Sequence, residues 1–285
     1  MLPTLRPIRL VFLLLTPLVS LAACYAPTVA RDRSYHPSDA DLTVTRIVHA
    51  SVIIDFGTTR ILVDPWFSPG PPIGQRETIG IAPDRLPPMR GILITHRHTD
   101  HYDRDTLDDY PDKRVRVVAA RGLGMDIRGL GYADVVEVDA WERTQIGDVI
   151  VTAVPSRHGV PEVGYILQAD SLTVYVAGDT LFDGDQFLEI AKAFPRIDVA
   201  LLPVGGVRIF GRRLDMGAED AARAVALLKP RRVIPYHYGL TGPFPFIFAP
   251  SDPANAFAEA VKKESVTPAA KVVLLQPGES WHHYR

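Results

Sequence analysis

Short runs of hydrophobic residues alternate with turn-forming residues along the chain from about Asp41 onward. The runs are rich in β-branched residues and are closed by Gly, Pro or Asp, a pattern that predicts β-strands. Such runs occupy residues 42–48, 51–57, 59–65, 89–95, 114–120, 135–138, 148–154, 164–169, 172–178, 199–204, 231–237 and 271–276. Strands therefore make up much of the predicted domain.

Helical patterns follow the strands in several places. We expect helices at residues 104–110 and 185–194, and an amphipathic helix at 218–229. A further helix begins at Asp252-Pro253, an N-cap residue followed by proline at the first helical position. Two runs of strands, each completed by helices, predict an α/β fold in which helices cover two sheets.

One long segment between predicted strands, Ser68 to Pro88, is rich in proline and glycine and contains little that could pair in a sheet. Loops of this length inside a compact domain are usually functional or disordered. We expect this loop to cover one edge of a binding site as a lid.

The N-terminus has the composition of an export signal. A short apolar run, Leu10 to Leu21, follows Arg6 and Arg9 and is too short to span a bilayer as a stable helix. The sequence Leu21-Ala22-Ala23-Cys24 resembles the lipobox of bacterial lipoproteins, which implies that Cys24 carries lipid and becomes the mature N-terminus. We therefore predict a signal peptide at 1–23, a flexible tether at 24–40 and a single folded domain at 41–285.

The composition narrows the chemistry. The chain has 285 residues, 31 basic and 33 acidic side chains and a net charge of −2. Proteins that bind nucleic acids by neutralising phosphates are usually basic, so we expect no nucleic-acid partner. Cys24 is the single cysteine. Once it carries lipid, a thiol enzyme and a cysteine-type zinc finger are excluded. A nucleophile or metal ligand must then come from histidine, carboxylate or hydroxyl groups.

The densest group of such residues is the pattern HxHxDH, which comprises His96, His98, Asp100 and His101 and directly follows the apolar run GILIT. Alternation along an extended segment places the imidazoles of His96 and His98 on the same side, and the chain then turns toward the next helix. Three imidazoles and one carboxylate within a few ångströms are ligands that zinc prefers. This segment therefore predicts a metal site.

Three further potential ligands follow apolar strands elsewhere in the chain, namely His158, Asp179 and His237. Each is the first good metal ligand beyond its strand, so all three could converge on one edge of the sheets. Taken one at a time, each has a simpler role as a hydrogen-bonding turn residue or a helix cap. Their occurrence together with HxHxDH favours a shared metal site.

This ordered series resembles the ligand series of the metallo-β-lactamase superfamily, and the resemblance covers nearly all of the chain beyond the leader. Segments 49–68, 201–206 and 227–239 are similar to the lactonase-type hydrolases that open ascorbate 6-phosphate. Segments 64–70, 86–107 and 178–205 look like the N-acyl-phosphatidylethanolamine phospholipase D group. The resemblance implies a four-layer αββα sandwich.

The resemblance also implies how the ligands divide between two divalent metal ions, with zinc expected and manganese or iron as alternatives. One ion would be held by His96, His98 and His158. The second would be held by Asp100, His101 and His237, with Asp179 bridging the two. A hydroxide that bridges two such metals is a nucleophile near neutral pH, and Asp100 could also assist proton transfer.

Two loops are candidates for contacting the substrate. Arg208, Arg212 and Arg213 follow the apolar strand LLPVGG, and guanidinium groups suit a phosphate or another anion. A solvated charged loop is the alternative. Phe244 and Phe246 lie in a proline-bearing loop after the last predicted ligand, where they could line a substrate pocket, face a membrane or pack under the last helix.

Other residues near these segments have simpler predicted roles. His49 is a single histidine between apolar strands, so we expect a core residue rather than a metal ligand. Asp64 and Trp66 follow another strand and could line the site. Residues 281–283, Trp-His-His, look like an exposed tail with no further partners.

The leading interpretation is a lipid-anchored, binuclear metal-dependent hydrolase of ester-type bonds, phosphodiester or lactone, that acts on a small anionic molecule or a lipid headgroup. A mononuclear iron oxidoreductase is the alternative enzyme, because some members of the superfamily hold iron. A metal-binding lipoprotein without catalysis is the alternative outside enzymes. Tyr25 after the lipidated cysteine predicts the periplasmic face of the outer membrane in a host with two membranes.

Overall fold

The computed structural model describes residues 35–70, 73–243, 246–264 and 269–284. The predicted signal peptide, Cys24, most of the predicted tether and Phe244 lie outside these residues. In the part of the chain that is described, no helix is long and apolar enough to cross a membrane. Tyr35, within the predicted tether, donates a hydrogen bond of 2.8 Å to Asp55, so the end of that segment contacts the folded domain.

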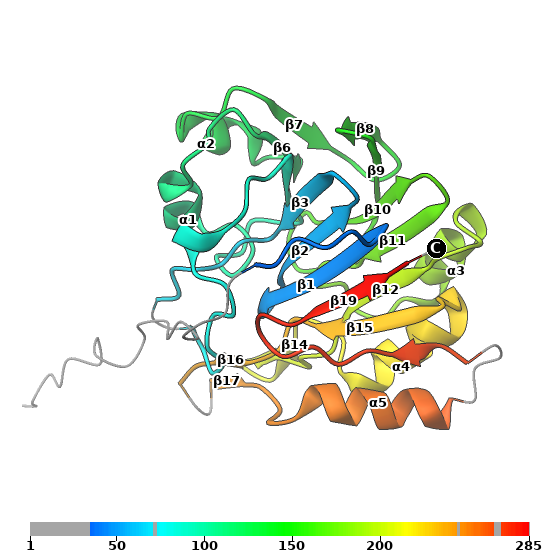
Figure 1. Ribbon diagram of the computed structural model, residues 1–285. Coiled ribbons are helices and arrows are strands. Elements are labelled where there is room, and N and C mark those ends of the chain that lie inside the picture. The colour runs from blue at the N-terminus through cyan, green and yellow to red at the C-terminus, as the bar shows by residue number, and fades with distance from the viewer. Residues whose placement is uncertain (1–34, 71–72, 244–245, 265–268, 285) are drawn as a thin grey trace, which may run out of the picture.

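Two seven-stranded sheets, counted over the described residues, form the centre of the fold (Figure 1). The first has the order β19 (Ser280–His283), β1 (Leu42–Val48), β2 (Ser51–Phe56), β3 (Thr59–Val63), β5 (Gly91–Ile94), β6 (Arg116–Ala120) and β7 (Val135–Val138). The second has the order β18 (Lys271–Val272), β15 (Arg232–Tyr236), β12 (Val199–Pro203), β11 (Leu172–Val176), β10 (Val163–Ala169), β9 (Val149–Pro155) and β8 (Arg143–Ile146). Both sheets contain parallel and antiparallel neighbours.

Helices cover the outer face of each sheet. α1 (Arg104–Asp109) and α2 (Gly124–Gly129) pack on the first sheet, and α3 (Gly184–Ala193), α4 (Ala218–Leu228) and α5 (Pro253–Lys263) pack on the second. Figure 1 shows the two helical groups on opposite sides of the molecule. The predicted four-layer αββα sandwich is therefore confirmed.

Local sequence explains where the helices begin. The carboxylates of Asp103, Asp183 and Asp252 accept hydrogen bonds from backbone N–H groups in the first turns of α1, α3 and α5, and these donors have no partner inside the helix. Pro253 occupies the first helical position of α5, as predicted. α2 was not predicted, because it begins and ends with glycine and has no side-chain N-cap that would mark its start.

Apolar side chains from alternate strand positions fill the space between the two sheets. Tyr165 on β10 of the second sheet donates a hydrogen bond of 2.8 Å to the backbone oxygen of Ile94, at the end of β5 in the first sheet. Tyr236 on β15 donates another of 2.8 Å to the backbone oxygen of Gly178, which follows β11. These bonds fix the strand ends that carry the predicted metal ligands.

The segment 68–88 contains a two-residue strand and is joined to the first sheet by an ion pair. Gly74–Gln75 forms β4, which pairs with β16 (Leu240–Thr241), and Pro83–Arg85 forms a short 3₁₀ helix. Glu77 accepts two hydrogen bonds from the guanidinium of Arg46 on β1, a residue that is fully buried. Strand β4 is only two residues long, in agreement with the expectation of little pairing. The composition did not indicate that the loop supplies the carboxylate partner of a buried arginine.

The C-terminal residues form an edge strand and not an exposed tail. β19 pairs with β1 in antiparallel register from Leu42–His283 to Thr45–Ser280, and Nδ1 of His282 lies 3.0 Å from Oγ1 of Thr43. The expectation of a tail without partners is therefore wrong. The pairing occurs because β1 would otherwise present a row of unpaired backbone groups at the sheet edge.

Gly80 allows the long loop to approach the first sheet closely. Its N–H donates a hydrogen bond of 2.9 Å to the backbone oxygen of Ile47, and a Cβ at Gly80 would lie 2.0 Å from the backbone nitrogen of Gly278. We predict that Gly80→Ala lowers the free energy of unfolding by about 1–3 kcal/mol, because backbone atoms must move to accept the methyl group. Chemical denaturation of the full chain measures this change.

Gly70 in the same loop provides the matched control, since a Cβ there would meet no atom within 4 Å. Gly70→Ala should change the free energy of unfolding by less than about 1 kcal/mol. Equal stability of the two variants would contradict the close approach of the loop at Gly80.

Candidate metal centre

The predicted ligands lie on loops at the carboxyl ends of strands from both sheets. His96 follows β5, His158 follows β9, Asp179 follows β11 and His237 follows β15. These strand ends meet at one edge of the sandwich. The structure thereby brings together all of the predicted ligands in two groups. One group contains His96, His98, His158 and Asp179, and the other contains Asp100, His101 and His237.

The first group comprises His96, His98, His158 and Asp179, whose ligating atoms lie within 4.8 Å of one another. Nδ1 of His98 is 3.0 Å from Nε2 of His96 and 3.0 Å from Nε2 of His158. Oδ2 of Asp179 is 3.8 Å from Nε2 of His96. His98 and His158 are partly exposed, so this group is accessible from solvent.

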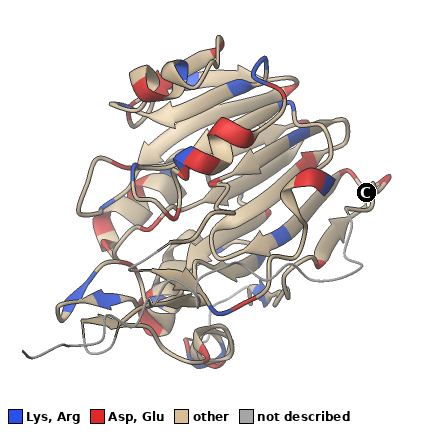
Figure 2. Ribbon diagram, turned by 90° about the vertical axis from the view of Figure 1, so that its left-hand side faces the viewer, with Lys and Arg blue, Asp and Glu red and all other residues tan. Residues whose placement is uncertain are grey.

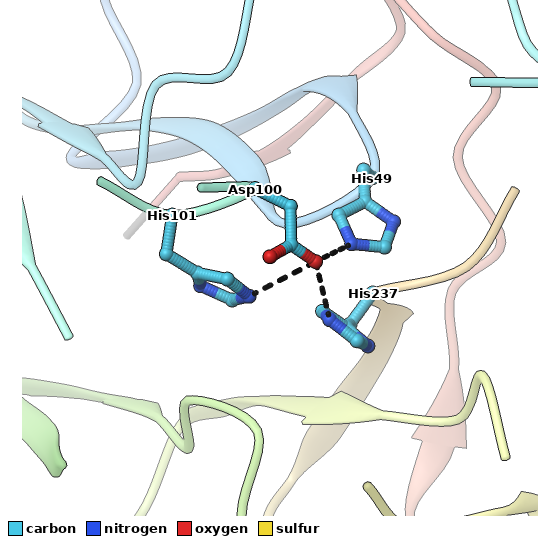
Figure 3. A group of neighbouring side chains, drawn as sticks. All are labelled: His49, Asp100, His101 and His237. Carbon is cyan, nitrogen blue, oxygen red and sulfur yellow. Dashed lines mark hydrogen bonds and ion pairs between the residues drawn. The ribbon is translucent and has the colours of Figure 1, made fainter. Parts of the chain in front are cut away.

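The second group comprises Asp100, His101 and His237 together with His49, and all four residues are buried. Figure 3 shows three imidazoles directed at one carboxylate oxygen of Asp100. Oδ2 of Asp100 lies 3.2 Å from Nε2 of His49, 3.6 Å from Nε2 of His237 and 3.9 Å from Nε2 of His101. His49, which we expected to be only a core residue, is buried and belongs to this group.

Asp179 contacts imidazoles of both groups. Besides its approach to His96, its Oδ1 lies 3.1 Å from Nε2 of His101 and its Oδ2 lies 2.9 Å from Nε2 of His237. The side chain is 4% exposed. Its two oxygens therefore occupy the space between the groups, which is the position that a bridging carboxylate requires.

An outer set of hydrogen-bond acceptors orients the histidines. Nδ1 of His96 lies 3.1 Å from Glu162, Nδ1 of His101 2.8 Å from Asp64, Nδ1 of His237 2.8 Å from Asp215, and Nδ1 of His158 2.9 Å from the backbone oxygen of Leu214. Such partners hold a proton on Nδ1 and leave the Nε2 lone pair for a metal. Each of these four imidazoles thus presents Nε2 to the centre of the cluster.

Sequence reasoning identified Asp64 only as a residue that could line the site, and it missed Glu162 and Asp215. Glu162 precedes a strand and Asp215 lies in a loop, so neither has the position after an apolar strand that marks the ligands. In the structure, the backbone conformation of three residues also marks the site. His49, Asp64 and His237 have left-handed φ values of 50°, 42° and 55°, a strained conformation that clusters at functional sites.

Several polar atoms in the cluster have no hydrogen bond. They are Nε2 of His101, Nε2 of His237 and Oδ1 of Asp179, all of which are buried. Asp179 lies within ion-pair distance of both imidazoles but not in hydrogen-bond geometry. A buried polar atom without a hydrogen bond costs about 1–3 kcal/mol, and a cation bound between these atoms would supply the missing interaction. Imidazole nitrogens and carboxylate oxygens are ligands of Zn²⁺ and related divalent ions. The residues therefore fit metal binding.

The electrostatic environments of the two groups differ. Burial and the neighbouring imidazole of His101 lower the pKa of His96 to about 3, and burial together with His96 lowers the pKa of His98 to about 4. Burial also lowers the pKa of His101 and His237, but Asp179 and other carboxylates outweigh it and raise both pKa values well above the ordinary range. In the absence of metal, His101 and His237 therefore hold protons at a pH where His96 and His98 do not.

A cavity of about 270 Å³ contacts both groups. Its polar wall includes His98, Asp100, Asp179 and His237. The rest of its wall is mainly apolar and includes Ile73, Val207, Ile209, Leu214 and Leu240. Ile73 belongs to the segment 68–88, so that loop contributes to the wall beside the metal ligands.

The arginines proposed from the sequence lie on a small three-stranded sheet with the order β14 (Arg212–Arg213), β13 (Arg208–Ile209) and β17 (Ile247–Phe248). Basic residues mark a hairpin that projects from the body of the molecule in Figure 2. Arg208 and Arg212 are exposed, and Arg213 forms an ion pair with Asp220. Among the described arginines, the cavity wall contains Arg97 and none of these three.

Phe246, the described member of the predicted aromatic pair, is 52% exposed and its ring centroid lies 5.5 Å from that of Phe210. Phe210 is 78% exposed. The two rings therefore form an apolar patch on the outside of the small sheet, and Phe246 is not part of the cavity wall. Phe244 lies outside the described residues.

An αββα sandwich with a cluster of histidines and aspartates at the strand ends defines the class of metallo-β-lactamase folds. Residues 59–238 match the sequence profile of the family described as "Beta-lactamase superfamily domain". This match covers more than half of the chain. The protein therefore belongs to the metallo-β-lactamase superfamily, and the resemblance drawn from its sequence is confirmed.

Individual relatives agree with this placement. A UPF0173 metal-dependent hydrolase of Pyrococcus furiosus is 34% identical over 252 residues, which cover 83% of this chain and 97% of the relative. Another from Thermococcus kodakarensis is 34% identical over 240 residues, which cover 81% of this chain and 95% of that protein. Among solved structures, Igni18, a metallo hydrolase from Ignicoccus hospitalis, has a TM-score of 0.65 and 25% identity, with 84% of this chain and 97% of that chain covered.

The difference in protonation predicts that the two groups respond differently to pH. Metal binding to the second group must displace protons from His101 and His237, whose pKa values are raised, whereas His96 and His98, with pKa values of about 3 and 4, are already neutral above about pH 5. Lowering the pH from about 8 to about 6 should weaken the binding of one Zn²⁺ ion at least about 10-fold more than the other.

Calorimetric titration of the full chain with Zn²⁺, in buffers of different ionisation enthalpy, measures both affinities and counts the protons released. The weaker binding at low pH should coincide with the larger proton release. An identical pH dependence of the two binding steps would contradict the assignment of separate protonation states.

Proposed function

We propose that this protein is a binuclear metal-dependent hydrolase that cleaves an ester-type bond, phosphodiester or lactone, in a small anionic substrate. The observation that carries the proposal is the meeting of two ligand groups around Asp179 at the wall of one cavity. The relatives from Pyrococcus furiosus and Thermococcus kodakarensis, both named metal-dependent hydrolases, support the same reaction class.

The division of ligands follows the two groups. His96, His98 and His158 would hold one metal, and Asp100, His101 and His237 would hold the other, with Asp179 between them. Zinc is the first candidate for this set of nitrogen and oxygen ligands, and manganese and iron are the alternatives. Divalent metals bound in this way lower the pKa of water to near neutrality, which makes a hydroxide nucleophile available.

The protein side chains prepare the site for that chemistry. The low pKa values of His96 and His98 leave both imidazoles neutral and able to act as ligands at neutral pH. Apolar residues such as Val207 and Leu240 surround the polar wall of the cavity and limit the access of bulk water. Asp100 lines the cavity, so its carboxylate is also positioned to take part in proton transfer, in addition to its role as a ligand.

The cavity also indicates how an anionic substrate would be held. Arg97 contributes to its wall. Its guanidinium donates a hydrogen bond to the backbone oxygen of Gly122 and would turn from there to pair with a phosphate or carboxylate near the metals. Arg208 and Arg212 are exposed on the neighbouring hairpin, where they would contact a more distant anionic part of a larger substrate, such as a lipid headgroup. Arg213 is committed to Asp220 and would support that hairpin.

We also propose that the protein is exported and held at a membrane through lipid on Cys24, at the periplasmic face of the outer membrane in a host with two membranes. The support is the sequence LAAC after a short apolar run with basic residues before it. The exposed rings of Phe210 and Phe246, on the same small sheet as Arg208 and Arg212, form a mixed apolar and basic surface that suits proximity to a membrane.

The function is tested by hydrolysis of bis(p-nitrophenyl) phosphate and of a simple lactone with the purified full-length protein, together with its metal content. We predict two zinc-type ions per chain and turnover of at least one substrate. His98→Ala should lower kcat/KM by more than about 100-fold and reduce the bound metal, because it removes a ligand. His36→Ala, which removes an imidazole distant from both groups, should leave both quantities unchanged.

Two outcomes would contradict the proposal. Full activity and full metal content in His98→Ala would mean that the metal lies elsewhere. Iron in the wild-type protein with hydrolysis of neither substrate would favour the oxidoreductase alternative.

A further inference from the structure

His49 has a proton whose position is fixed by a backbone carbonyl. Its Nδ1 lies 3.1 Å from the backbone oxygen of Tyr238, and a carbonyl oxygen can only accept a hydrogen bond. Nδ1 must therefore carry the proton and donate it. In the neutral imidazole, Nε2 then presents a lone pair and cannot act as a donor.

That lone pair faces a second acceptor. Nε2 of His49 lies 3.2 Å from Oδ2 of Asp100, within a buried pair. Two acceptors at this distance repel each other unless a positive charge lies between or beside them. The same carboxylate oxygen is 3.6 Å from Nε2 of His237 and 3.9 Å from Nε2 of His101, so three imidazoles surround one anionic oxygen (Figure 3).

We propose that His49 is a further protein ligand of the second metal ion, in addition to Asp100, His101, His237 and the bridging Asp179. This inference rests on the binuclear function proposed above. A tetrahedral Zn²⁺ ion with bonds of about 2.0–2.1 Å separates its ligand atoms by about 3.3–3.4 Å. The distances from Oδ2 of Asp100 to Nε2 of His49, His237 and His101 are 3.2, 3.6 and 3.9 Å, so one is slightly shorter than this value and two are longer.

The fold holds His49 rigidly in this position. It lies in the tight turn between β1 and β2 with a left-handed φ of 50°, and its edge packs against Trp66 with ring centroids 5.0 Å apart. Its backbone oxygen accepts a hydrogen bond of 3.0 Å from the N–H of His237. This hydrogen bond fixes the backbone of His49 relative to that of His237. The strained backbone conformation of His49 directs its Nε2 toward the cluster.

This additional ligand makes the two metal positions unequal. With Asp179 counted at both positions, the second has five protein ligands and the first has four, so the second leaves less room for water or substrate. The second group is buried throughout, and the first includes the partly exposed His98 and His158. The first position would thus receive the substrate, and the second would be held firmly and exchange slowly.

Titration of the metal-free full-length protein with Co²⁺ tests this inference through visible absorption, which reports the number and type of ligands. The wild-type protein should bind two equivalents. His49→Ala should bind the first-group ion as the wild type does, and should bind the second at least about 100-fold more weakly, with a changed absorption spectrum. His36→Ala is the control and should match the wild type in both steps.

His49→Gln separates a ligand from a residue that only positions Asp100. The glutamine amide can donate a hydrogen bond to the Asp100 carboxylate, but its nitrogen cannot bind the metal and its oxygen is a much weaker ligand than imidazole for a zinc-type ion. The variant should therefore lose the second equivalent as His49→Ala does. Recovery of wild-type affinity and spectrum in His49→Gln would overturn the inference and assign His49 a positioning role.

The remaining outcomes distinguish this inference from the proposed function. Two equivalents in the wild type with an unchanged second step in His49→Ala would overturn the role of His49 and leave the binuclear function standing. Fewer than two equivalents in the wild type would overturn both.

Discussion

The structure depends on the burial of one carboxylate among imidazoles. Asp179 is nearly inaccessible, and burial alone would raise its pKa, but His101 and His237 hold that pKa well below the ordinary value. A buried charge is tolerated only when opposite charge lies beside it. Here that charge reaches Asp179 from the loops that follow β5 in one sheet and β15 in the other, so the two sheets must assemble correctly before the carboxylate is compensated. The stability of the fold is therefore coupled to the charge state of the site. Bound metal ions would take the place of the protons on His101 and His237.

The two ligand groups differ in protonation and in exposure to solvent, and this difference indicates separate roles. His96 and His98 are kept neutral by burial and by neighbouring imidazoles, and the group that contains them is accessible from solvent. His101 and His237 are surrounded by carboxylates and are buried. A site of the first kind accepts a metal and a substrate with little rearrangement, whereas a site of the second kind needs a cation for its own stability. This asymmetry links the packing of the sandwich to the proposed chemistry.

Much of the fold, and the seven side chains that gather in the two groups, could be predicted from sequence, because strands, N-caps and HxHxDH are local patterns. Asp103 and Asp252 mark helix starts, and His158 and His237 follow apolar runs. The parts that sequence could not predict depend on which strand ends meet. Glu162 and Asp215 orient histidines that lie far from them in sequence, and β19 pairs with a strand more than 200 residues away. The position of His49 beside Asp100 likewise arises only when the first turn of the sheet meets the HxHxDH loop.

The central claim is that two metal ions occupy one cluster that is shared by both sheets. Anomalous X-ray diffraction at the zinc absorption edge, from crystals of the zinc-loaded full-length protein, tests it most directly. The structure predicts two anomalous peaks on either side of Asp179, one beside His96, His98 and His158 and the other beside Asp100, His101 and His237. A single peak, or peaks away from these side chains, would contradict the claim.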